Sequence, residues 1–329
     1  MVAYPPSLDL ARLDTPLQPL ERLSEQLGIE TLVKRDDMTG VLLSGNKVRK
    51  LEFLLAAAVD AGARGVITCG GQQSNHARAT ALSAARLGLG CELLLRCTDP
   101  ESPPTPSANI LLDRVAGAKI EWITKAQYAE RDALMAERAA ALEQQTGGPW
   151  YVVPEGGSNA LGAWGYVRCL HELRAELGDQ PATIVCAVGS GGTVAGLVAG
   201  CRIYDMPYRV VGFCVCDDRP TFQQRIAAIL DEMASDYDVD VATEPEGIEI
   251  IDAYVGDGYA LSRDEELVSI IEVARLEGIV TDPVYTGKAL YGLRQEIAKG
   301  KRFDGPLVFL HTGGIYGLLA KAQQITPLL

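Results

Sequence analysis

The stretch Ser44-Gly45-Asn46-Lys47-Val48-Arg49-Lys50-Leu51-Glu52 places a lysine directly after a Ser-Gly-Asn turn. Glycine and asparagine tolerate the tight backbone from which a chain re-enters a helix. Apolar residues then recur at helical spacing, at positions 48, 51, 54 and 55. The pattern therefore predicts a helix whose N-terminus lies close to Lys47.

Lys47 is an unusual residue for that position. The positive end of a helix dipole favours the neutral amine over the ammonium ion, and a neutral lysine amine is a nucleophile that forms Schiff bases with carbonyl compounds. The same stretch is also typical of a solvated basic face that includes Arg49 and Lys50. On these residues alone the solvated face is the more common interpretation, so other segments have to separate the two.

The composition is that of a globular protein, with 47% of the 329 residues hydrophobic and 22% charged. The net charge of −13 and the lack of a Lys/Arg-rich run argue against nucleic acid as a partner. We find no signal-peptide pattern and no apolar run of membrane-spanning length, so we expect a cytoplasmic protein without membrane contact. The eight cysteines lie mainly in apolar segments and are expected to be small buried side chains rather than metal ligands.

Strand-like apolar runs alternate with helical patterns, which predicts parallel sheets covered by helices. The expected strands are residues 30–34, 65–69, 91–96, 119–124, 150–154, 183–188, 210–215 and 306–310. One long helix is expected over residues 127–145, and an irregular, solvated excursion over residues 235–250. The cluster Arg35-Asp36-Asp37 is expected to form a local ion-pair turn.

Glycine-rich turns follow several of these strands, and the turn Gly189-Ser190-Gly191-Gly192-Thr193 is the clearest anion cradle among them. Backbone N–H groups of small residues and two hydroxyls can close on a phosphate at a helix N-terminus. The turn lacks the lysine of a Walker P-loop, which argues against a nucleotide triphosphatase. Its third glycine is out of register for a dinucleotide fingerprint, and no convincing acidic residue follows about 20 positions on, so a nicotinamide enzyme is only a runner-up.

A Schiff-base lysine, a phosphate cradle and polar turns at strand ends together fit pyridoxal 5′-phosphate (PLP). Over nearly its whole length the sequence resembles the fold-type II PLP enzymes of the D-cysteine desulfhydrase and 1-aminocyclopropane-1-carboxylate deaminase family. The matching motifs are KRDDMTG, SGNKVRKLEF, QSNHAR, EGGSNALGAWGYV, VGSGGTVAGL, TDPVYTGKA and HTGG. Their number and order favour the Schiff-base interpretation of Lys47 over the solvated face.

The resemblance implies a role for each matching residue. Lys47 would carry PLP through a Schiff base and later move the Cα proton, and the Gly189–Thr193 turn would hold the phosphate. Asn75 would bond the phenolic oxygen of PLP, while Gln73 and Ser74 would grip the substrate carboxylate, with Ser74 also assisting proton transfer. Tyr259 and Tyr285 resemble the two active-site tyrosines of the family, and Tyr285 is the better placed by motif. His76 and His311, beside these motifs, are expected to be supporting hydrogen-bond partners.

Thr312 is the most informative match. A hydroxyl facing the pyridine nitrogen leaves the ring a weaker electron sink than a carboxylate would, which favours β-elimination. The deaminases of the family have Glu after the tyrosine and no threonine in the last turn, whereas this chain has Thr286 and Thr312. The resemblance is therefore to the desulfhydrase branch. Ser44 and Trp164 depart from the family pattern, and both are expected to reshape the pocket.

The sequence thus predicts a PLP-dependent carbon–sulfur lyase that converts D-cysteine to pyruvate, hydrogen sulfide and ammonia. L-Cysteate sulfo-lyase, β-chloroalanine elimination and 1-aminocyclopropane-1-carboxylate deaminase are the alternatives within this chemistry, and a non-catalytic PLP-binding protein is the alternative outside it. The resemblance implies a homodimer and two open parallel-sheet α/β domains of the tryptophan synthase β-like type. The expected limits are 1–49 and 156–329 for a large PLP-binding domain and 50–155 for a small one, with the cofactor between them.

Overall fold

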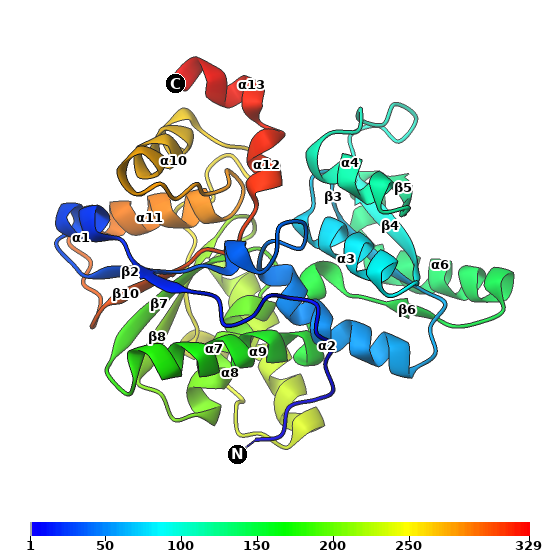
Figure 1. Cartoon of the computed structure of the whole chain (residues 1–329), viewed down its shortest axis with the longest axis horizontal. Coiled ribbons are helices and arrows are strands. Elements are labelled where there is room, and N and C mark those ends of the chain that lie inside the picture. The colour runs from blue at the N-terminus through cyan, green and yellow to red at the C-terminus, as the bar shows by residue number, and fades with distance from the viewer. Residues whose placement is uncertain (1) are drawn as a thin grey trace.

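The computed structural model describes residues 2–329, and its longer sheet has six strands in the order β1-β2-β10-β7-β8-β9 (Figure 1). All neighbours in this sheet are parallel except β1 and β2. The strands are β1 (Leu17–Pro19), β2 (Thr31–Lys34), β10 (Leu307–Leu310), β7 (Ala182–Val188), β8 (Tyr208–Cys214) and β9 (Glu249–Ile251). Because β2 and β10 are neighbours, the two ends of the chain contribute to one sheet.

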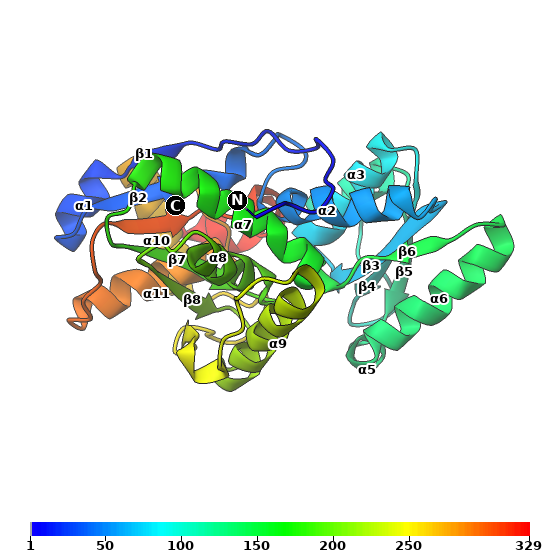
Figure 2. The same cartoon turned by 90° about the horizontal axis from the view of Figure 1, so that it is seen from below.

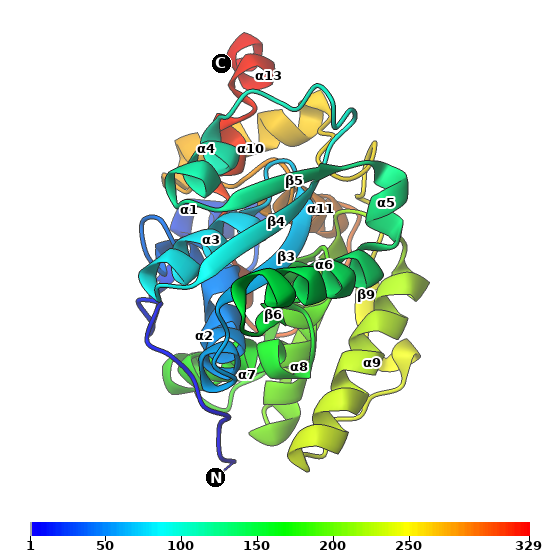
Figure 3. The same cartoon turned by 90° about the vertical axis from the view of Figure 1, so that its right-hand side faces the viewer.

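The second sheet has four parallel strands in the order β5-β4-β3-β6. They are β5 (Lys119–Ile123), β4 (Gly90–Arg96), β3 (Gly65–Gly71) and β6 (Trp150–Val152). Figure 3 shows this sheet face-on in front of the rest of the chain. The central segment of the chain therefore builds a sheet of its own.

Helices cover both faces of both sheets (Figure 2). On β7, Ile184 and Cys186 belong to a core with α7, α8 and α9, whereas Val185 belongs to a core with α1, α10 and α11. The helices are α1 (Glu21–Leu27), α2 (Asn46–Asp60), α3 (Asn75–Arg86), α4 (Ala108–Val115), α5 (Lys125–Ala129), α6 (Arg131–Thr146), α7 (Ala160–Leu177), α8 (Gly192–Ile203), α9 (Arg219–Tyr237), α10 (Asp264–Glu277), α11 (Thr286–Ala298), α12 (Ile315–Leu319) and α13 (Ala322–Ile325). Short 3₁₀ turns are η1 (Asp36–Met38), η2 (Glu155–Gly157), η3 (Pro245–Gly247) and η4 (Thr326–Leu328). The predicted α/β class with two parallel-sheet units is confirmed.

Helix α2 packs against both sheet units. It contacts α7 beside the six-stranded sheet and α3 beside the four-stranded sheet. Phe53 joins the core of the first unit, and Leu51, Leu54 and Leu55 join the core of the second. Helix α2, with Lys47 in its first turn, is therefore fixed where the two units meet, and the domain limits at residues 50 and 156 stay a prediction.

Two expectations about local structure are wrong. The single helix expected over residues 127–145 is broken at Glu130, where the backbone (φ −99°, ψ 22°) ends α5 and starts α6. The excursion expected over residues 235–250 instead continues α9 to Tyr237 and adds the edge strand β9, with Ile248 and Ile250 buried. Burial of two isoleucines outweighs the acidic composition of that segment.

Among residues 2–329, no helix is both long and apolar enough to cross a membrane.

Candidate active site

The turn before α2 is pressed against the last turn of the six-stranded sheet. Gly45 has a positive φ of 108°, and a side chain there would place its Cβ 2.6 Å from the Thr312 carbonyl oxygen. The Asn46 N–H donates to that same oxygen at 3.2 Å. Only glycine fits this close approach, so the predicted turn and helix start are confirmed and Lys47 comes to the carboxyl edge of β10.

A first cavity opens at this edge. It is lined by Asn46, Lys47, Asn75, Ala187, Val188, Gly189, Ser190, Gly191, Thr193, Val194, Tyr285, Thr312 and Gly313. The turn after β7 forms its floor and leads into the N-terminus of α8, with Gly191 at φ 92°. The Asn46 side-chain amide donates to the Thr193 hydroxyl at 3.1 Å and ties the two walls together.

Lys50 is a buried cation beside this cavity. Its ammonium lies 3.2 Å from the Gly156 carbonyl oxygen and 3.1 Å from the Ser158 hydroxyl, which in turn lies 2.8 Å from the Ser190 hydroxyl. Within residues 2–329 no carboxylate lies within salt-bridge distance of it. Burial, and then repulsion from Lys47, lower the pKa of Lys50 well below its ordinary value. A buried lysine without an acidic partner fits a site that receives an anion.

A second cavity also has Lys47 in its wall. It is lined by Lys47, Cys69, Gly70, Gly71, Ser74, His76, Tyr128, Glu155, Gly156, Gly189, Ser190, Tyr259 and Tyr285. Lys47, Gly189, Ser190 and Tyr285 line both cavities. The lysine amine therefore stands at the boundary between the two spaces.

The Lys47 amine has few polar contacts, the one within range being the Gly156 carbonyl oxygen at 3.5 Å. Burial lowers the pKa of Lys47 to about 8, against the opposing field of the Glu155 carboxylate. A substantial fraction of the amine is therefore neutral near physiological pH, which is the form that attacks a carbonyl carbon.

Tyr259 and Tyr285 meet at the second cavity from separate segments. Their hydroxyl oxygens are 2.7 Å apart, and their rings are inclined at 72°. Burial raises the pKa of Tyr259 to about 12, and burial together with the nearby Tyr259 raises that of Tyr285 further. The Asp282 carboxylate accepts from the backbone N–H of Tyr285 and from the Thr286 hydroxyl, so it holds this turn in place. Thr286 is therefore buried against Asp282 and lines neither cavity.

The three residues Gln73, Ser74 and Asn75 at the start of α3 have side chains in three different places. Ser74 is the helix N-cap, accepts from the Ala77 N–H at 3.1 Å and lines the second cavity, while Asn75 lines the first. The Gln73 side chain instead accepts from the Asn109 N–H at 2.9 Å and lies outside both cavities.

The expectation that His76 and His311 are hydrogen-bond partners is confirmed. His76 Nε2 lies 2.9 Å from the Thr68 hydroxyl, and His311 accepts from the Gly313 N–H at 3.2 Å. Burial lowers the pKa of both imidazoles, and for His76 the charges of Lys47 and Lys50 lower it further. Both side chains are therefore neutral near pH 7.

Neither Ser44 nor Trp164 lines a cavity at the site, so a change of pocket shape by these two residues stays a prediction. The Ser44 hydroxyl donates to the Asp37 carbonyl oxygen at 2.8 Å. Trp164 is fully buried on α7, in edge-to-face contact with Tyr4 and Tyr237. Trp164 is thus a core residue.

Sequence reasoning missed two contributors to the site. Lys50 follows Lys47 by three positions, which places both on one face of a helix, and this spacing was the available signal. Glu155 lines the second cavity because its turn follows β6, and its pairing with Tyr128 across the smaller unit left no local signal in the sequence.

The residues present fit PLP on the evidence of the structure itself. A side chain at Gly192 would place its Cβ 2.7 Å from the Ser158 hydroxyl and 2.9 Å from the Lys50 ammonium, so the cradle accepts only a bare backbone there. The buried Lys50 lacks an anion, and a substantial fraction of the Lys47 amine is neutral. An anionic ligand that carries an aldehyde satisfies all three features.

Comparison with known proteins points in the same direction. The family model described as "Pyridoxal-phosphate dependent enzyme" matches residues 8–313. A D-cysteine desulfhydrase of Yersinia enterocolitica is 41% identical, with 97% of each chain covered. A bifunctional D-cysteine desulfhydrase/1-aminocyclopropane-1-carboxylate deaminase of Arabidopsis thaliana is 40% identical, over 98% of this chain and 82% of the relative.

Solved structures extend the comparison to the fold. The crystal structure of an ACC deaminase homologue superposes with a TM-score of 0.90 at 36% identity, covering 99% of this chain and 97% of that one. A fungal L-serine ammonia-lyase from Rhizomucor miehei shares the fold, with a TM-score of 0.68 at 18% identity over 97% of this chain and 99% of that one. From the match over most of its length, the chain belongs to the pyridoxal-phosphate dependent enzyme family, and its cofactor is pyridoxal 5′-phosphate.

Proposed function

We propose that this enzyme is a lyase that converts D-cysteine and water to pyruvate, hydrogen sulfide and ammonia. The observation that carries the proposal is the position of Lys47, whose partly neutral amine separates a phosphate-type cradle from a second cavity to which Ser74, Tyr259 and Tyr285 present hydroxyl groups. The names of relatives at about 40% identity support the choice of substrate.

In this proposal the first cavity holds the cofactor. The Lys47 amine would bond its aldehyde carbon, while Gly189, Ser190, Gly191, Gly192 and Thr193 would hold its phosphate and Lys50 would compensate the phosphate charge. Asn75 would bond the phenolic oxygen, and the Thr312 hydroxyl would be the partner of the pyridine nitrogen. When bound, the cofactor withdraws electrons from the α-carbon of the amino acid.

The chain's own groups handle the protons in the second cavity. Lys47 Nζ accepts the Cα proton, which its lowered pKa permits near neutral pH. The hydroxyls of Tyr285 and Tyr259, hydrogen-bonded to each other, supply a proton to the departing sulfur. Ser74 at the N-terminus of α3 receives the substrate carboxylate, because that helix end favours negative charge. Gln73 completes this end of the site if its side chain leaves Asn109.

Ring opening of 1-aminocyclopropane-1-carboxylate is the alternative with support of its own, because one relative is named for both activities. Against it stand Thr286, which is occupied by Asp282, and Thr312, which offers a hydroxyl rather than a carboxylate to the first cavity. L-Cysteate elimination uses the same groups with sulfite as leaving group. A non-catalytic PLP-binding protein would have no use for three hydroxyls around Lys47.

The test is to supply purified enzyme with D-cysteine, L-cysteine, L-cysteate and 1-aminocyclopropane-1-carboxylate separately. Pyruvate, sulfide, sulfite and 2-oxobutanoate are assayed while the visible absorption of bound PLP is recorded. We expect sulfide and pyruvate from D-cysteine, and loss of both product formation and the visible band in Lys47→Ala but not in the control Lys299→Ala, which removes an exposed lysine. PLP-loaded wild type that yields no sulfide from D-cysteine contradicts the proposal.

We further propose that the enzyme is a homodimer. Exposed apolar side chains gather on the loop after η1, on α4 and on α12, where Tyr316 donates to the Val41 carbonyl oxygen and α4 packs on α12. They are Met38, Val41, Leu42, Leu111, Val115, Ile315 and Leu319. An apolar surface that spans both sheet units is typical of an interface. Sedimentation analysis measures the mass of the particle in solution, and the mass of two chains is expected.

We also propose a cytoplasmic location. All eight cysteines are unpaired, which supports a reducing compartment.

A further inference from the structure

We propose that Glu155 makes the second cavity select amino acids whose β-substituent is neutral or donates hydrogen bonds, and reject those whose β-substituent is anionic. The inference rests on the proposed function in one respect, namely that the second cavity receives the substrate side chain. It separates thiol or amide side chains from sulfonate or carboxylate ones, and so narrows the substrate class of this site.

The charges around the second cavity carry the first step. Thirteen residues line this cavity, all within the described chain. Among them Lys47 is the single lysine and Glu155 is the single carboxylate. His76 is neutral because burial and two nearby lysines lower its pKa. The field of Glu155 reaches Lys47, where it opposes the lowering of the pKa by burial.

The break between α5 and α6 places two partners on Glu155. The Tyr128 hydroxyl, on α5, donates to one carboxylate oxygen, and Arg131 Nε, on α6, lies 3.0 Å from the other. The Arg131 guanidinium also donates to the Tyr128 carbonyl oxygen at 3.2 Å. The carboxylate is thus held in one orientation beside a permanent cation.

The nearby guanidinium groups do not reverse the sign of the charge that a substrate meets. Neither Arg131 nor Arg96 lines the cavity. Arg96 stacks on the rings of Tyr128 and Tyr259, at 4.9 and 5.5 Å from their centroids. Tyr128 and Glu155 therefore present acceptor oxygens, because the tyrosine proton is already donated to the carboxylate. A β-sulfonate or β-carboxylate meets like charge at contact distance, which disfavours it.

The α-carboxylate of the substrate is not subject to the same repulsion. Ser74 caps α3, a helix of twelve residues, in the turn after β3, whereas Glu155 lies in η2 after β6, so the two line the cavity from different segments. A helix N-terminus stabilises an anion. The cavity thus offers one place for a carboxylate and a separate, acceptor-rich place for the rest of the side chain.

The experiment compares asparagine with aspartate, which have nearly the same shape and differ in the charge of the β-substituent, and neither has a good leaving group. Binding of each enantiomer to the PLP-loaded enzyme is measured by calorimetry, without turnover. We expect wild type to bind asparagine more tightly than aspartate by about tenfold or more in at least one enantiomer, and Glu155→Gln to bring the ratio to within about threefold. Asp132→Asn removes an exposed charge next to Arg131 and should leave the ratio unchanged.

Equal binding of the two ligands to wild type overturns the inference, as does a preference that persists in Glu155→Gln, or the failure of both ligands to bind. If Glu155→Gln does not fold, Glu155→Ser removes the same charge, and Tyr128→Phe, which keeps the carboxylate, must keep the preference. Sulfide release from D-cysteine is assayed in parallel. If the enzyme releases sulfide from D-cysteine but binds asparagine and aspartate equally, only this inference is overturned. If it prefers asparagine but releases no sulfide, the proposed reaction is overturned and the selectivity of the cavity stands.

Discussion

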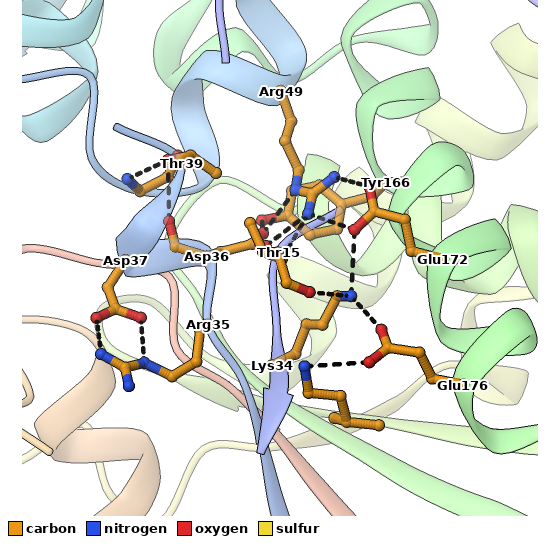
Figure 4. A network of polar contacts seen from close by, with 12 residues as sticks. Thr15, Lys34, Arg35, Asp36, Asp37, Thr39, Arg49, Tyr166, Glu172 and Glu176 are labelled. Atoms are coloured by element: carbon orange, nitrogen blue, oxygen red, sulfur yellow. Dashed lines mark hydrogen bonds and ion pairs between the residues drawn. The ribbon is translucent and has the colours of Figure 1, made fainter. Parts of the chain in front are cut away.

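Helix α2 carries three basic side chains within four residues, and its two sides differ in how the charge is compensated. On the side of the cavities, Lys50 is buried and Lys47 is half-buried, and neither has a carboxylate in ion-pair contact among the described residues. On the opposite side, Arg49 is as buried as Lys50 but has two carboxylates in contact (Figure 4).

The Arg49 side is a closed ion-pair network. The guanidinium bonds Asp36 at 2.7 and 2.9 Å and Glu172 at 2.6 and 2.9 Å. Tyr166 donates to Asp36 at 2.6 Å, and Lys34 lies 3.2 Å from Glu172 (Figure 4). Burial alone would raise the pKa of Asp36, but the charge of Arg49 outweighs it and holds that pKa below its usual range.

The difference distinguishes charges that stabilise the fold from charges that can bind a ligand. Where the protein supplies both signs, burial is compensated before any ligand binds. Where it supplies only the cation, the apoenzyme holds an uncompensated charge that an anionic cofactor can neutralise. The same helix is thus anchored to the six-stranded unit on one side and prepares the cofactor site on the other.

The largest expected effect comes from breaking the paired side with Arg49→Met. Asp36 would stay buried without its cation, and Glu172 would keep only Lys34, which should lower the free energy of unfolding by about 3–5 kcal/mol. Denaturant unfolding of the apoenzyme measures it. The control Arg209→Met removes a half-exposed bidentate pair with Glu249 and should cost about 0–1 kcal/mol. An Arg49 variant no less stable than the Arg209 variant contradicts the account.

The stability difference between wild type and Arg49→Met should also depend on pH. Because the folded pKa of Asp36 is lowered, the pair adds stability that is present above the ordinary aspartate pKa and is lost as pH falls through the folded value. The gap between wild type and Arg49→Met should therefore narrow on acidification.

The next effect comes from the unpaired side, through Lys50→Met. We expect PLP affinity to fall by about 10- to 100-fold, because a charge-assisted bond to phosphate is lost. The apoenzyme should become more stable by about 1–3 kcal/mol, because the pKa of Lys50 is lowered in the folded state and its burial opposes folding at all pH values below the ordinary lysine pKa.

Lys34→Met is the matched control for Lys50, since Lys34 is an equally buried lysine that contacts Glu172 and Glu176. It should destabilise the apoenzyme and leave PLP affinity unchanged. Titration of the apoproteins with PLP, together with denaturant unfolding, measures both quantities. Opposite signs of the two stability changes are required, and a destabilised Lys50→Met apoenzyme would remove the distinction between the two sides of the helix.

The two sides of α2 also differ in how much of their structure could be predicted from the sequence. The turn at Gly45 and the start of α2 follow from local chemistry, and the alternation of strands and helices follows from periodicity, so both could be predicted. The partners of Arg49 could not, because Glu172 is far from it in sequence and Asp36 was read as part of a local turn. Only the Arg35–Asp37 pair of that turn is local, at 2.7 Å, while Asp36 points inward to α2 and α7.

The division of the site between two sheet units limited prediction in the same way. Lys47, Ser74, Tyr259 and Tyr285 are brought to one cavity by motifs that each lie at the carboxyl edge of a parallel strand or next to one. Glu155 comes to that cavity in the turn after β6. Tyr128 and Arg131, on the two sides of the break at Glu130, hold its carboxylate there. A periodic pattern that continues through Glu130 predicts a single helix and hides the contact.

The smallest expected effect tests the charge state of Lys47 itself. The rate at which the apoenzyme captures PLP depends on the neutral amine, because only that form attacks the aldehyde. With a pKa of about 8, the neutral fraction rises by about threefold between pH 7.5 and 8.5 and then levels off, whereas an ordinary lysine would give about tenfold. Stopped-flow mixing with PLP, followed by visible absorption, measures the rate.

Glu155→Gln sharpens this last prediction, because the Glu155 carboxylate raises the pKa of Lys47 against the effect of burial. Removing that charge should lower the pKa further and move the plateau of the capture rate to lower pH, whereas the exposed control Asp132→Asn should leave it in place. A capture rate that climbs tenfold per pH unit through pH 9 would mean that Lys47 titrates like a solvated lysine. The cavity side of α2 would then hold its charge no differently from the protein surface, and the comparison with Arg49 would lose its basis.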